Sequence, residues 1–312
     1  MRISSPLIAA AAAAVLSVSA APAFAQGSAC DRACLGDVMT RYLDSLVAHD
    51  PKVAPLADKV RFTEDTVETA IGEGFWKTAT KLRPYRVDFL DVRQSTAAVL
   101  AVLEEGGKPV LFAARLKVAN RRITEIETMV VRNAQEAMLF APDSLKEKSV
   151  AMTTMPDKAK LTPREQMVEI ALRYPAGLRA GSFVKADVPF GPGAYRLENG
   201  VKMAGPGCGF QPPSCEDIRN QGIPTLPEVK GHVVAVDEEA GLVLLRLDFG
   251  RGSLMGGGRG RGARAGGAPA VEQVLVTFEG FKIYDGKIHA VEAFMKNVPV
   301  GVGSGWPQLN MP

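Results

Sequence analysis

Histidine is scarce in this chain, and its scatter excludes several kinds of chemistry. The three histidines, His49, His232 and His289, lie far apart in the sequence. Their spacing is not that of a metal site, so we expect no metal and no cofactor. A nucleophile elbow and a recognisable Ser–His–Asp or Cys–His set are also missing. These absences disfavour a metalloenzyme and an enzyme with an activated serine or cysteine.

Long apolar runs are absent beyond the N-terminus, so we expect no membrane span in the rest of the chain. The N-terminal run, from Leu7 to Leu16, follows the basic Arg2 and precedes a small-x-small site at 23–25. This order is typical of a secretory signal peptide. We expect residues 1–25 to be removed after Ala25, which predicts a periplasmic or secreted protein.

An excess of one charge is absent outside a single segment. The formal net charge is +3, and four arginines lie together in the glycine-rich insertion 250–270. The rest of the mature chain is close to neutral, so we expect no specific nucleic-acid partner. The insertion matches loose phosphate-loop patterns, but no helix follows it, and we expect a hairpin loop. Contact of its arginines with acidic envelope polymers or nucleic acid is the alternative.

Cysteine is limited to four residues, Cys30, Cys34, Cys208 and Cys215. In an exported chain we expect two disulfides, and the spacing favours Cys30–Cys34 and Cys208–Cys215 among three possible pairings. A metal or redox site is disfavoured because no histidine lies near either pair. Lipidation of Cys30 is a further alternative, although no leucine-led box precedes it.

An internal repeat is the main positive feature. The segment RITEIETM, 122–129, aligns with KIHAVEAF, 287–294, and earlier segments align in the same order. The offset grows only across the insertions 204–228 and 250–270, as expected when loops lengthen after a duplication. We therefore predict a first domain over 26–132, a connector over 133–160, a second domain over 161–300 and a tail over 301–312.

Each repeat predicts the same order of elements. Apolar residues recur at helical spacing between Leu35 and Val47, and again from Met167 until Pro175 disturbs the pattern. A short irregular segment follows, and long strands close each repeat. We expect these strands near 85–93, 97–104, 109–119 and 122–131, then near 230–237, 241–249, 271–284 and 287–296.

This order of elements resembles the nuclear transport factor 2-like superfamily, which includes SnoaL-like proteins. The segments CDRACL, RYLDSLVAHDP, GEGFW and DEEAGLV also resemble an exported fungal and bacterial family of unknown function. The resemblance implies an α+β fold: two tandem cone-shaped domains, each a helical N-terminal part packed on a curled antiparallel sheet. Because the superfamily dimerises sheet to sheet, it also implies a pseudo-dimer within one chain. Paired histidines, as in scytalone dehydratase-like sites, are missing.

The repeated glutamates Glu127 and Glu292 are the predicted catalytic residues. In a strand, alternate residues share a face, so Glu292 lies with Ile288, Ala290 and Phe294. A carboxylate on an apolar face loses hydration, which raises its pKa and suits a general acid or base. The alternative is a structural ion pair with a buried arginine, for which Arg41, Arg115 and Arg173 are candidates.

Other repeated residues are predicted to bind substrate. Glu64 and Glu198 follow the helix of each repeat, and Glu73 and Trp76 lie near Glu64. An aromatic ring beside a carboxylate can hold a planar ligand and tune the acid. Tyr42 and Tyr174 repeat on the helices, and the superfamily resemblance implies that they donate to a substrate oxygen. Core packing for the rings and a solvated Glu73 are the alternatives.

We therefore expect an exported protein with a pocket for a small apolar organic molecule. One hypothesis is a cofactor-free lyase, isomerase or hydrolase that transfers a proton through a pocket glutamate. The other is a non-catalytic binding module for a ligand or a partner in the cell envelope. Whether each glutamate meets an arginine or an open cavity separates the two hypotheses.

Overall fold

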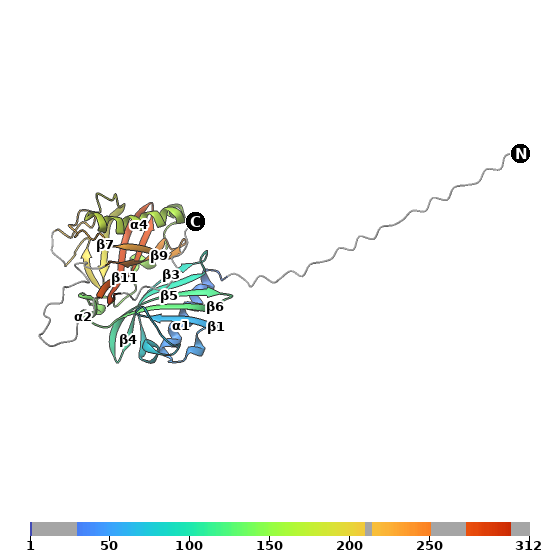
Figure 1. Ribbon diagram of the computed structural model, residues 1–312. Coiled ribbons are helices and arrows are strands. Elements are labelled where there is room, and N and C mark those ends of the chain that lie inside the picture. Colours follow the sequence, from blue (N-terminus) through green and yellow to red (C-terminus); the bar gives the residue numbers. More distant parts are fainter. Residues whose placement is uncertain (2–29, 210–213, 251–272, 301–312) are drawn as a thin grey trace.

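Two six-stranded sheets with the same strand order make up the described part of the chain. The computed structural model describes Met1 and residues 30–209, 214–250 and 273–300. The sheet orders are β2-β1-β6-β5-β4-β3 and β8-β7-β12-β11-β10-β9, so each strand of the first sheet has a counterpart in the second (Figure 1). The predicted signal peptide, most of the insertion 250–270 and the tail lie outside the described residues.

The first sheet follows helix α1 (Arg32–Val47), which Asp31 caps by accepting from the backbone N–H of Cys34. Its strands are β1 (Leu56–Glu64), β2 (Val67–Glu68), β3 (Ala79–Asp91), β4 (Thr96–Glu105), β5 (Lys108–Ala119) and β6 (Arg122–Val131). Short 3-10 helices, η1 (Pro51–Val53) and η2 (Gly74–Lys77), lie between α1 and β3. The four closing strands match the predicted ones within a few residues, except that β3 begins earlier.

The second sheet follows helix α4 (Arg164–Ala180). Its strands are β7 (Phe190–Glu198), β8 (Val201–Ala204), β9 (Lys230–Asp237), β10 (Leu242–Asp248), β11 (Gln273–Tyr284) and β12 (Lys287–Pro299). The expectation that Pro175 disturbs the helix was wrong. α4 continues past the buried Pro175 and ends at Gly181, which adopts the left-handed conformation typical of a helix C-terminus.

The predicted fold class, helix-packed cones with antiparallel sheets, was wrong. Strands account for most of the regular structure, and each half has only one helix longer than four residues within the described part. The sheets are mixed, because β1 runs parallel to β6 and β7 runs parallel to β12. The segments read as irregular are in fact β1 and β7, which extend each sheet beyond the predicted strands. The molecule is therefore a pair of sheet-rich units.

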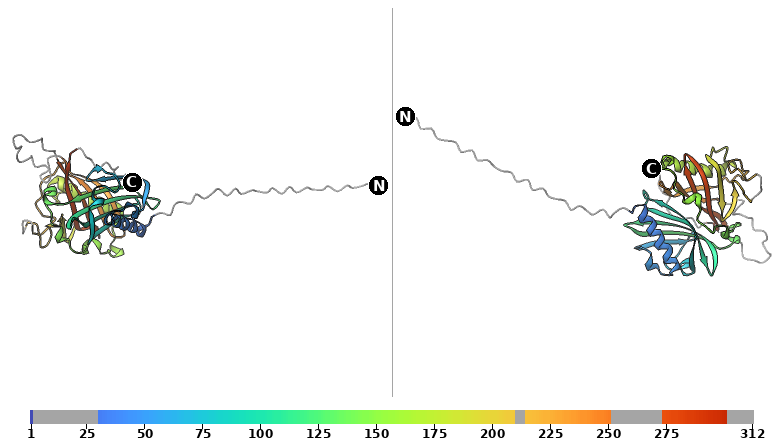
Figure 2. Two further views of the ribbon diagram at one scale, coloured as in Figure 1. Left: turned by 90° about the horizontal axis from the view of Figure 1, so that it is seen from below. Right: turned by 180° about the vertical axis from the view of Figure 1, so that it is seen from behind.

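The two faces of the first sheet have different partners. One face packs against α1 (Figure 2). The core between them includes Leu43, Ala97, Phe112 and Val130. The opposite face shares a larger core with the second half, which includes Phe89 and residues of β10, β11 and β12. Each sheet therefore has a helix-side face, next to α1 or α4, and the first sheet also packs on the second half.

Short helices connect the halves. The connector carries α2 (Ala134–Ala137), η3 (Pro142–Ser144), α3 (Val150–Thr153) and η4 (Lys158–Lys160). Lys282 of β11 is buried and donates to the carbonyls of Thr154 and Ala240, both at 2.6 Å, which ties the connector to the second sheet.

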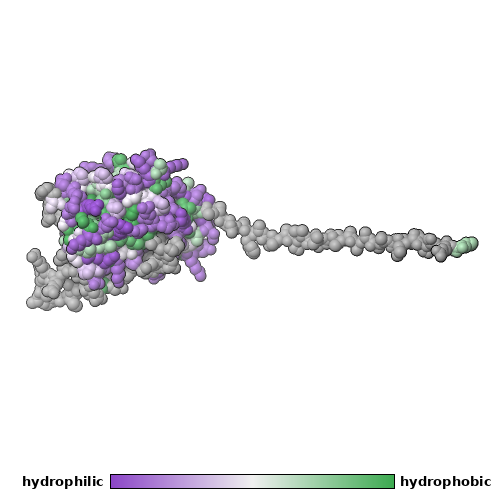
Figure 3. Space-filling model, turned by 90° about the horizontal axis from the view of Figure 1, so that it is seen from above, coloured by the Kyte–Doolittle hydropathy of each residue, from purple (hydrophilic) through white to green (hydrophobic). Residues whose placement is uncertain are grey.

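The surface in Figure 3 is mostly hydrophilic, with apolar residues scattered over it. Within the described residues, no helix has the length and apolar character that a membrane crossing requires.

Gly280 lies where the second sheet packs tightly against Phe89 of the first. A Cβ at this position would lie 2.5 Å from Cζ of Phe89 and 3.1 Å from Cε of Met152. Because the overlap must be relieved inside a packed core, we expect Gly280→Ala to lower the free energy of unfolding by about 1–3 kcal/mol. Chemical denaturation measures the loss. Gly209→Ala, whose Cβ meets no atom within 4 Å, is the control, and an equal effect of both substitutions would contradict close packing at Gly280.

Candidate functional site

Glu127 lies between the halves, not beside α1. It is 3% exposed, and its Oε1 lies 3.2 Å from Nε of Arg246 on β10. The two atoms are within ion-pair distance but are not aligned for a hydrogen bond. Burial raises the pKa of Glu127 to about 7, and the positive charge of Arg246 opposes this rise. Arg115, one of the three arginines suggested as partners, lies opposite Glu127 in the sheet and also opposes the rise, whereas Arg246 was not among the three. The raised pKa shows that desolvation outweighs both charges.

Glu292 also lies between the halves, where three hydroxyl groups donate to its carboxylate. Tyr85 donates at 2.5 Å, and Tyr195 and Ser149 donate at 2.6 Å. Gly280 occupies the place opposite Glu292 that Arg115 occupies opposite Glu127, so the register partner of Glu292 brings no cation. Glu292 lines an open cavity of about 430 Å³ beside the connector, whereas the lining of the four cavities described here excludes Glu127. A catalytic role for either glutamate stays a prediction.

The helix-side interior of the first half is filled by aromatic side chains. Tyr42 is fully buried and its ring lies edge-on to Trp76, with centroids 5.3 Å apart. The indole N–H of Trp76 donates to the carbonyl of Ser45, and the backbone N–H of Phe75 donates to Glu64. Glu73 lies on the surface and forms an ion pair with Lys77. The four predicted binding residues of this half therefore belong to a packed core and its rim.

The corresponding interior of the second half contains a cavity of about 300 Å³. Both predicted binding residues of this half line it: Tyr174 on α4 and Glu198 on β7. The cavity is partly apolar and partly polar. Its lining also includes Leu178, Arg196, Met203, Gln221, Gly222, Ile223, Pro224, Leu226, Phe249, Leu275, Glu279 and Met295. A cavity of this size, mostly apolar with a few convergent polar groups, is typical of a small-molecule site.

Arg196 organises the polar side of the cavity. Its Nη1 donates to the hydroxyl of Tyr174 at 3.1 Å, and its Nη2 donates to Oε1 of Gln221 at 3.0 Å. Its Nε lies 2.9 Å from Oε1 of Glu198, close enough for charge pairing but not aligned for a hydrogen bond. The other oxygen of Glu198, Oε2, is buried and makes no hydrogen bond to any described residue. A ligand with a hydroxyl or amino group would supply the donor that Glu198 lacks.

Glu279 is the carboxyl group of this cavity whose acidity is altered. It lies on β11 and is 3% exposed. Burial raises its pKa to about 8, repulsion from Glu198 adds to the rise, and Arg196 opposes it. At neutral pH this carboxyl is therefore mostly protonated while its neighbour Glu198 is paired with a cation. Two carboxyl groups in different environments provide an acid and a base at one site.

Strand register shows how the two halves diverged at this place. The repeated glutamates Glu127 and Glu292 serve as the common reference for comparing the two sheets. Phe62 pairs with the residue before Glu127, and Arg196 pairs with the residue before Glu292. Phe62 and Arg196 therefore occupy equivalent positions. By the same rule Ala114 is equivalent to Glu279, and Phe112 is equivalent to Thr277. Three apolar residues of the filled interior are thus polar in the half with the cavity. A change from apolar to polar inside a core costs stability, which indicates a role other than packing.

Arg196, Gln221 and Glu279 were missed by the sequence argument. Apart from Glu73 and Trp76, the predicted site residues occur in both repeats, whereas these three occur in only one. Glu279 does give a signal in the sequence, since it interrupts the apolar run from Val274 to Phe281. Among the residues that the structure describes, no group of three His, Cys, Asp or Glu side chains is arranged to hold a metal ion.

The cavity wall is tied to a disulfide. Cys208 and Cys215 are bonded, and so are Cys30 and Cys34, which are the pairings that the spacing favoured. The backbone N–H of Gly205 donates to the carbonyl of Cys215, and the side chain of Gln221 donates to the carbonyl of Met203. These bonds hold Gly205, the disulfide and Gln221 against the cavity. Two disulfides and no free cysteine among the described residues fit an oxidising compartment.

Comparison with known proteins places the cavity in a segment with family relatives. Residues 160–295 match the family model described as "Domain of unknown function (DUF8021)". No curated protein matches. One similar solved structure is a de novo designed protein with a curved β-sheet, with 21% identity, a TM-score of 0.27, and coverage of 32% of this chain and 87% of that chain. The family-model match supports the resemblance to a family of unknown function over residues 160–295. It gives no support to the resemblance to the nuclear transport factor 2-like superfamily.

Proposed function

We propose that this chain is an exported protein that binds a small molecule in the cavity of the second half. The ligand is neutral and largely apolar, and the protein catalyses proton transfer to and from it. The observation that carries the proposal is Glu279, a buried carboxyl group in a cavity, protonated near neutral pH beside a charge-paired Glu198. The interior of the first half is filled, so its role in this activity is structural. It packs on the second half, and the two halves form a pseudo-dimer within one chain.

The charges of the cavity select a neutral ligand. At neutral pH the positive charge of Arg196 is balanced by Glu198, and Glu279 is mostly uncharged. An anionic ligand would meet the free oxygen of Glu198 without a free cation, because Arg196 already serves Tyr174, Gln221 and Glu198. A neutral carbonyl compound fits better: Glu279 donates to its oxygen, and apolar residues such as Leu178 and Phe249 contact its body.

The reaction that fits this pair is a proton shift next to a carbonyl. Oε2 of Glu198 removes a proton from the carbon adjacent to the carbonyl, and the protonated Glu279 donates its proton to the carbonyl oxygen. The product of this step is an enol, and return of the protons to other positions gives an isomer of the substrate. The step needs neither an oxidant nor a cofactor, and a positioned acid and base contribute about 10²–10⁴-fold each.

The test is exchange of hydrogen for deuterium next to the carbonyl of small cyclic ketones in D₂O, followed by proton NMR. We expect the protein to accelerate exchange, and Glu279→Gln and Glu198→Gln each to reduce the rate by about 10²-fold or more. Glu64→Gln is the matched control, because Glu64 is the register equivalent of Glu198 in the filled half. Equal loss in the control, or no loss in Glu279→Gln, would sink the proposal.

A non-catalytic binding module is the second candidate. The observation in its favour is the hydrogen-bond network in which Arg196 donates to Tyr174 and Gln221. Such a network can bind a ligand without catalysing a reaction. Chemical-shift changes caused by the same ketones in both the wild type and Glu279→Gln, with no exchange in either, would support this reading.

A further inference from the structure

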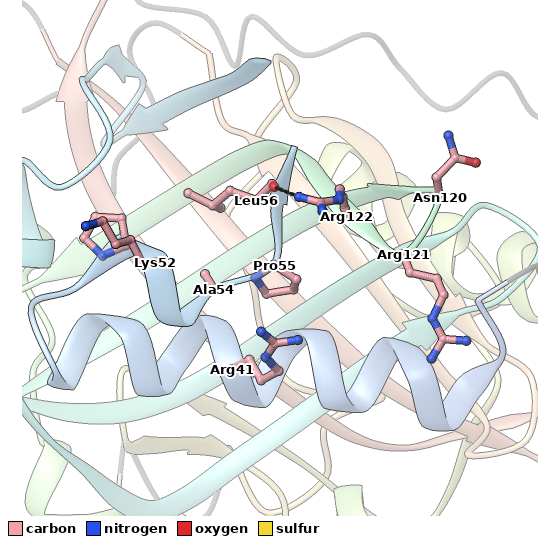
Figure 4. A pocket seen from close by; sticks show the side chains of 9 residues that line it. Arg41, Lys52, Ala54, Pro55, Leu56, Asn120, Arg121 and Arg122 are labelled. Carbon is pink, nitrogen blue, oxygen red and sulfur yellow. Dashed lines mark hydrogen bonds between the residues drawn. The ribbon is translucent and has the colours of Figure 1, made fainter. Parts of the chain in front are cut away.

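The first half carries an open basic hollow, lined by Arg41, Lys52, Arg121 and Arg122, with Pro51, Ala54, Pro55, Leu56 and Asn120. Its volume is about 630 Å³, and none of its lining residues is acidic. Arg41 stands on α1 and points toward Pro55, while Arg121 extends toward the same helix from the turn between β5 and β6 (Figure 4). Four exposed cations from three separate segments therefore face one hollow.

Unpaired arginines gather at this place. Most other arginines of the described chain lie within ion-pair distance of a carboxylate: Arg32, Arg83, Arg86, Arg93, Arg115, Arg132, Arg164, Arg173, Arg196, Arg219 and Arg246. Arg179 instead donates to the carbonyl of Val229. Arg41 and Arg121 have no carboxylate partner among the described residues. Arg122 is oriented by a bond of 2.9 Å to the carbonyl of Leu56, which leaves its charge uncompensated.

The backbone at Arg121 gives a second, independent observation. Asn120 and Arg121 form the turn with φ of 51° and 62°, a region that costs a residue with a side chain roughly 1 kcal/mol or more. The equivalent turn of the second half places Gly286 where the first half has Arg121. An arginine is thus kept at a position where glycine would be more stable, and such strain is typical of residues retained for function.

We propose that the basic hollow binds a small multivalent oxyanion, such as a ligand with two or more phosphate or carboxylate groups. Guanidinium groups pair with these oxyanions through two parallel hydrogen bonds, and several guanidiniums accommodate more than one such group. The hollow has the size of a small-molecule site. Ala54, Pro55 and Leu56 supply an apolar floor for the body of the ligand. This site uses the first half alone and does not rest on the cavity of the second half.

The test is titration of the full chain with pyrophosphate and with citrate by calorimetry at low salt. We expect saturable 1:1 binding that weakens with added salt, and the stronger of the two anions identifies the phosphate or the carboxylate class. Arg121→Gly should weaken binding about tenfold, as expected for loss of a charged hydrogen bond, while the melting temperature stays equal or rises. A purely structural role for Arg121 predicts a lower melting temperature instead.

Lys158→Gln is the matched control, because it removes the same charge from an exposed position on η4, outside the hollow. We expect its affinity to equal that of the wild type. The proposal is overturned if neither anion binds, if the control loses as much affinity as Arg121→Gly, or if only an anionic polymer such as polygalacturonate binds.

Discussion

Arg246→Leu is expected to destabilise the protein by about 3–5 kcal/mol at pH 9, because the substitution removes the cation that most opposes the desolvation of the buried, charged Glu127. Leucine is a fair replacement, since Leu100 occupies the equivalent position of the first sheet. The pair also joins the halves, with Glu127 on β6 and Arg246 on β10, so the loss concerns the interface between the sheets. Chemical denaturation of the wild type and the variant measures it.

The dependence of this loss on pH separates the ion pair from simple packing. Because the pKa of Glu127 is raised to about 7, the carboxyl is mostly neutral at pH 5 and needs no cation there. We expect Arg246→Leu to cost much less at pH 5 than at pH 9. The double variant Arg246→Leu with Glu127→Leu should recover much of the lost stability at pH 9, because both buried charges are then gone. Equal losses at both pH values would contradict the pairing.

The closing strands and the disulfides were accessible from the sequence, whereas the fold class was not. β4, β5 and β11 are long apolar runs bounded by turn residues, so local pattern was sufficient. β1 shows no alternation between buried and exposed residues, and its partner β6 lies about sixty residues away. A parallel pairing of this kind depends on tertiary packing, which no local signal reports. Because β1 was not predicted, the expected sheet was smaller than the observed six-stranded sheet, and it was antiparallel instead of mixed.

The candidate site was half accessible for a related reason. Repetition led to Tyr174 and Glu198, which do line the cavity, but it also led to Tyr42 and Glu64, whose half is filled. Repeated residues report what both halves need, above all the core and the contact between sheets. The residues that distinguish the halves at equal register, such as Arg196 and Glu279, report what one half does alone. Register became visible only with the strand pairing in hand.

The stability of the whole protein is expected to depend on pH through Glu279. The pKa of Glu279 is about 8 in the folded chain and has its ordinary value, 4.5, when unfolded. The folded state therefore holds this proton more tightly. The associated stability is fully present below pH 4.5, declines as the pH rises from 4.5 to 8, and is constant above 8. A difference of this size corresponds to a loss of up to about 5 kcal/mol. Glu127, with a pKa of about 7, adds a loss of the same sign.

Glu279→Gln should remove this decline without changing the shape of the side chain. At pH 5 the variant and the wild type should have similar free energies of unfolding, because the wild-type carboxyl is then neutral as well. At pH 9 the variant should be the more stable by several kcal/mol, since it carries no buried charge beside Glu198. Denaturant titrations from pH 5 to pH 9 measure both curves, with the exposed Glu73→Gln as control. If Glu279→Gln keeps the wild-type slope, Glu279 is not the protonated acid that the cavity requires.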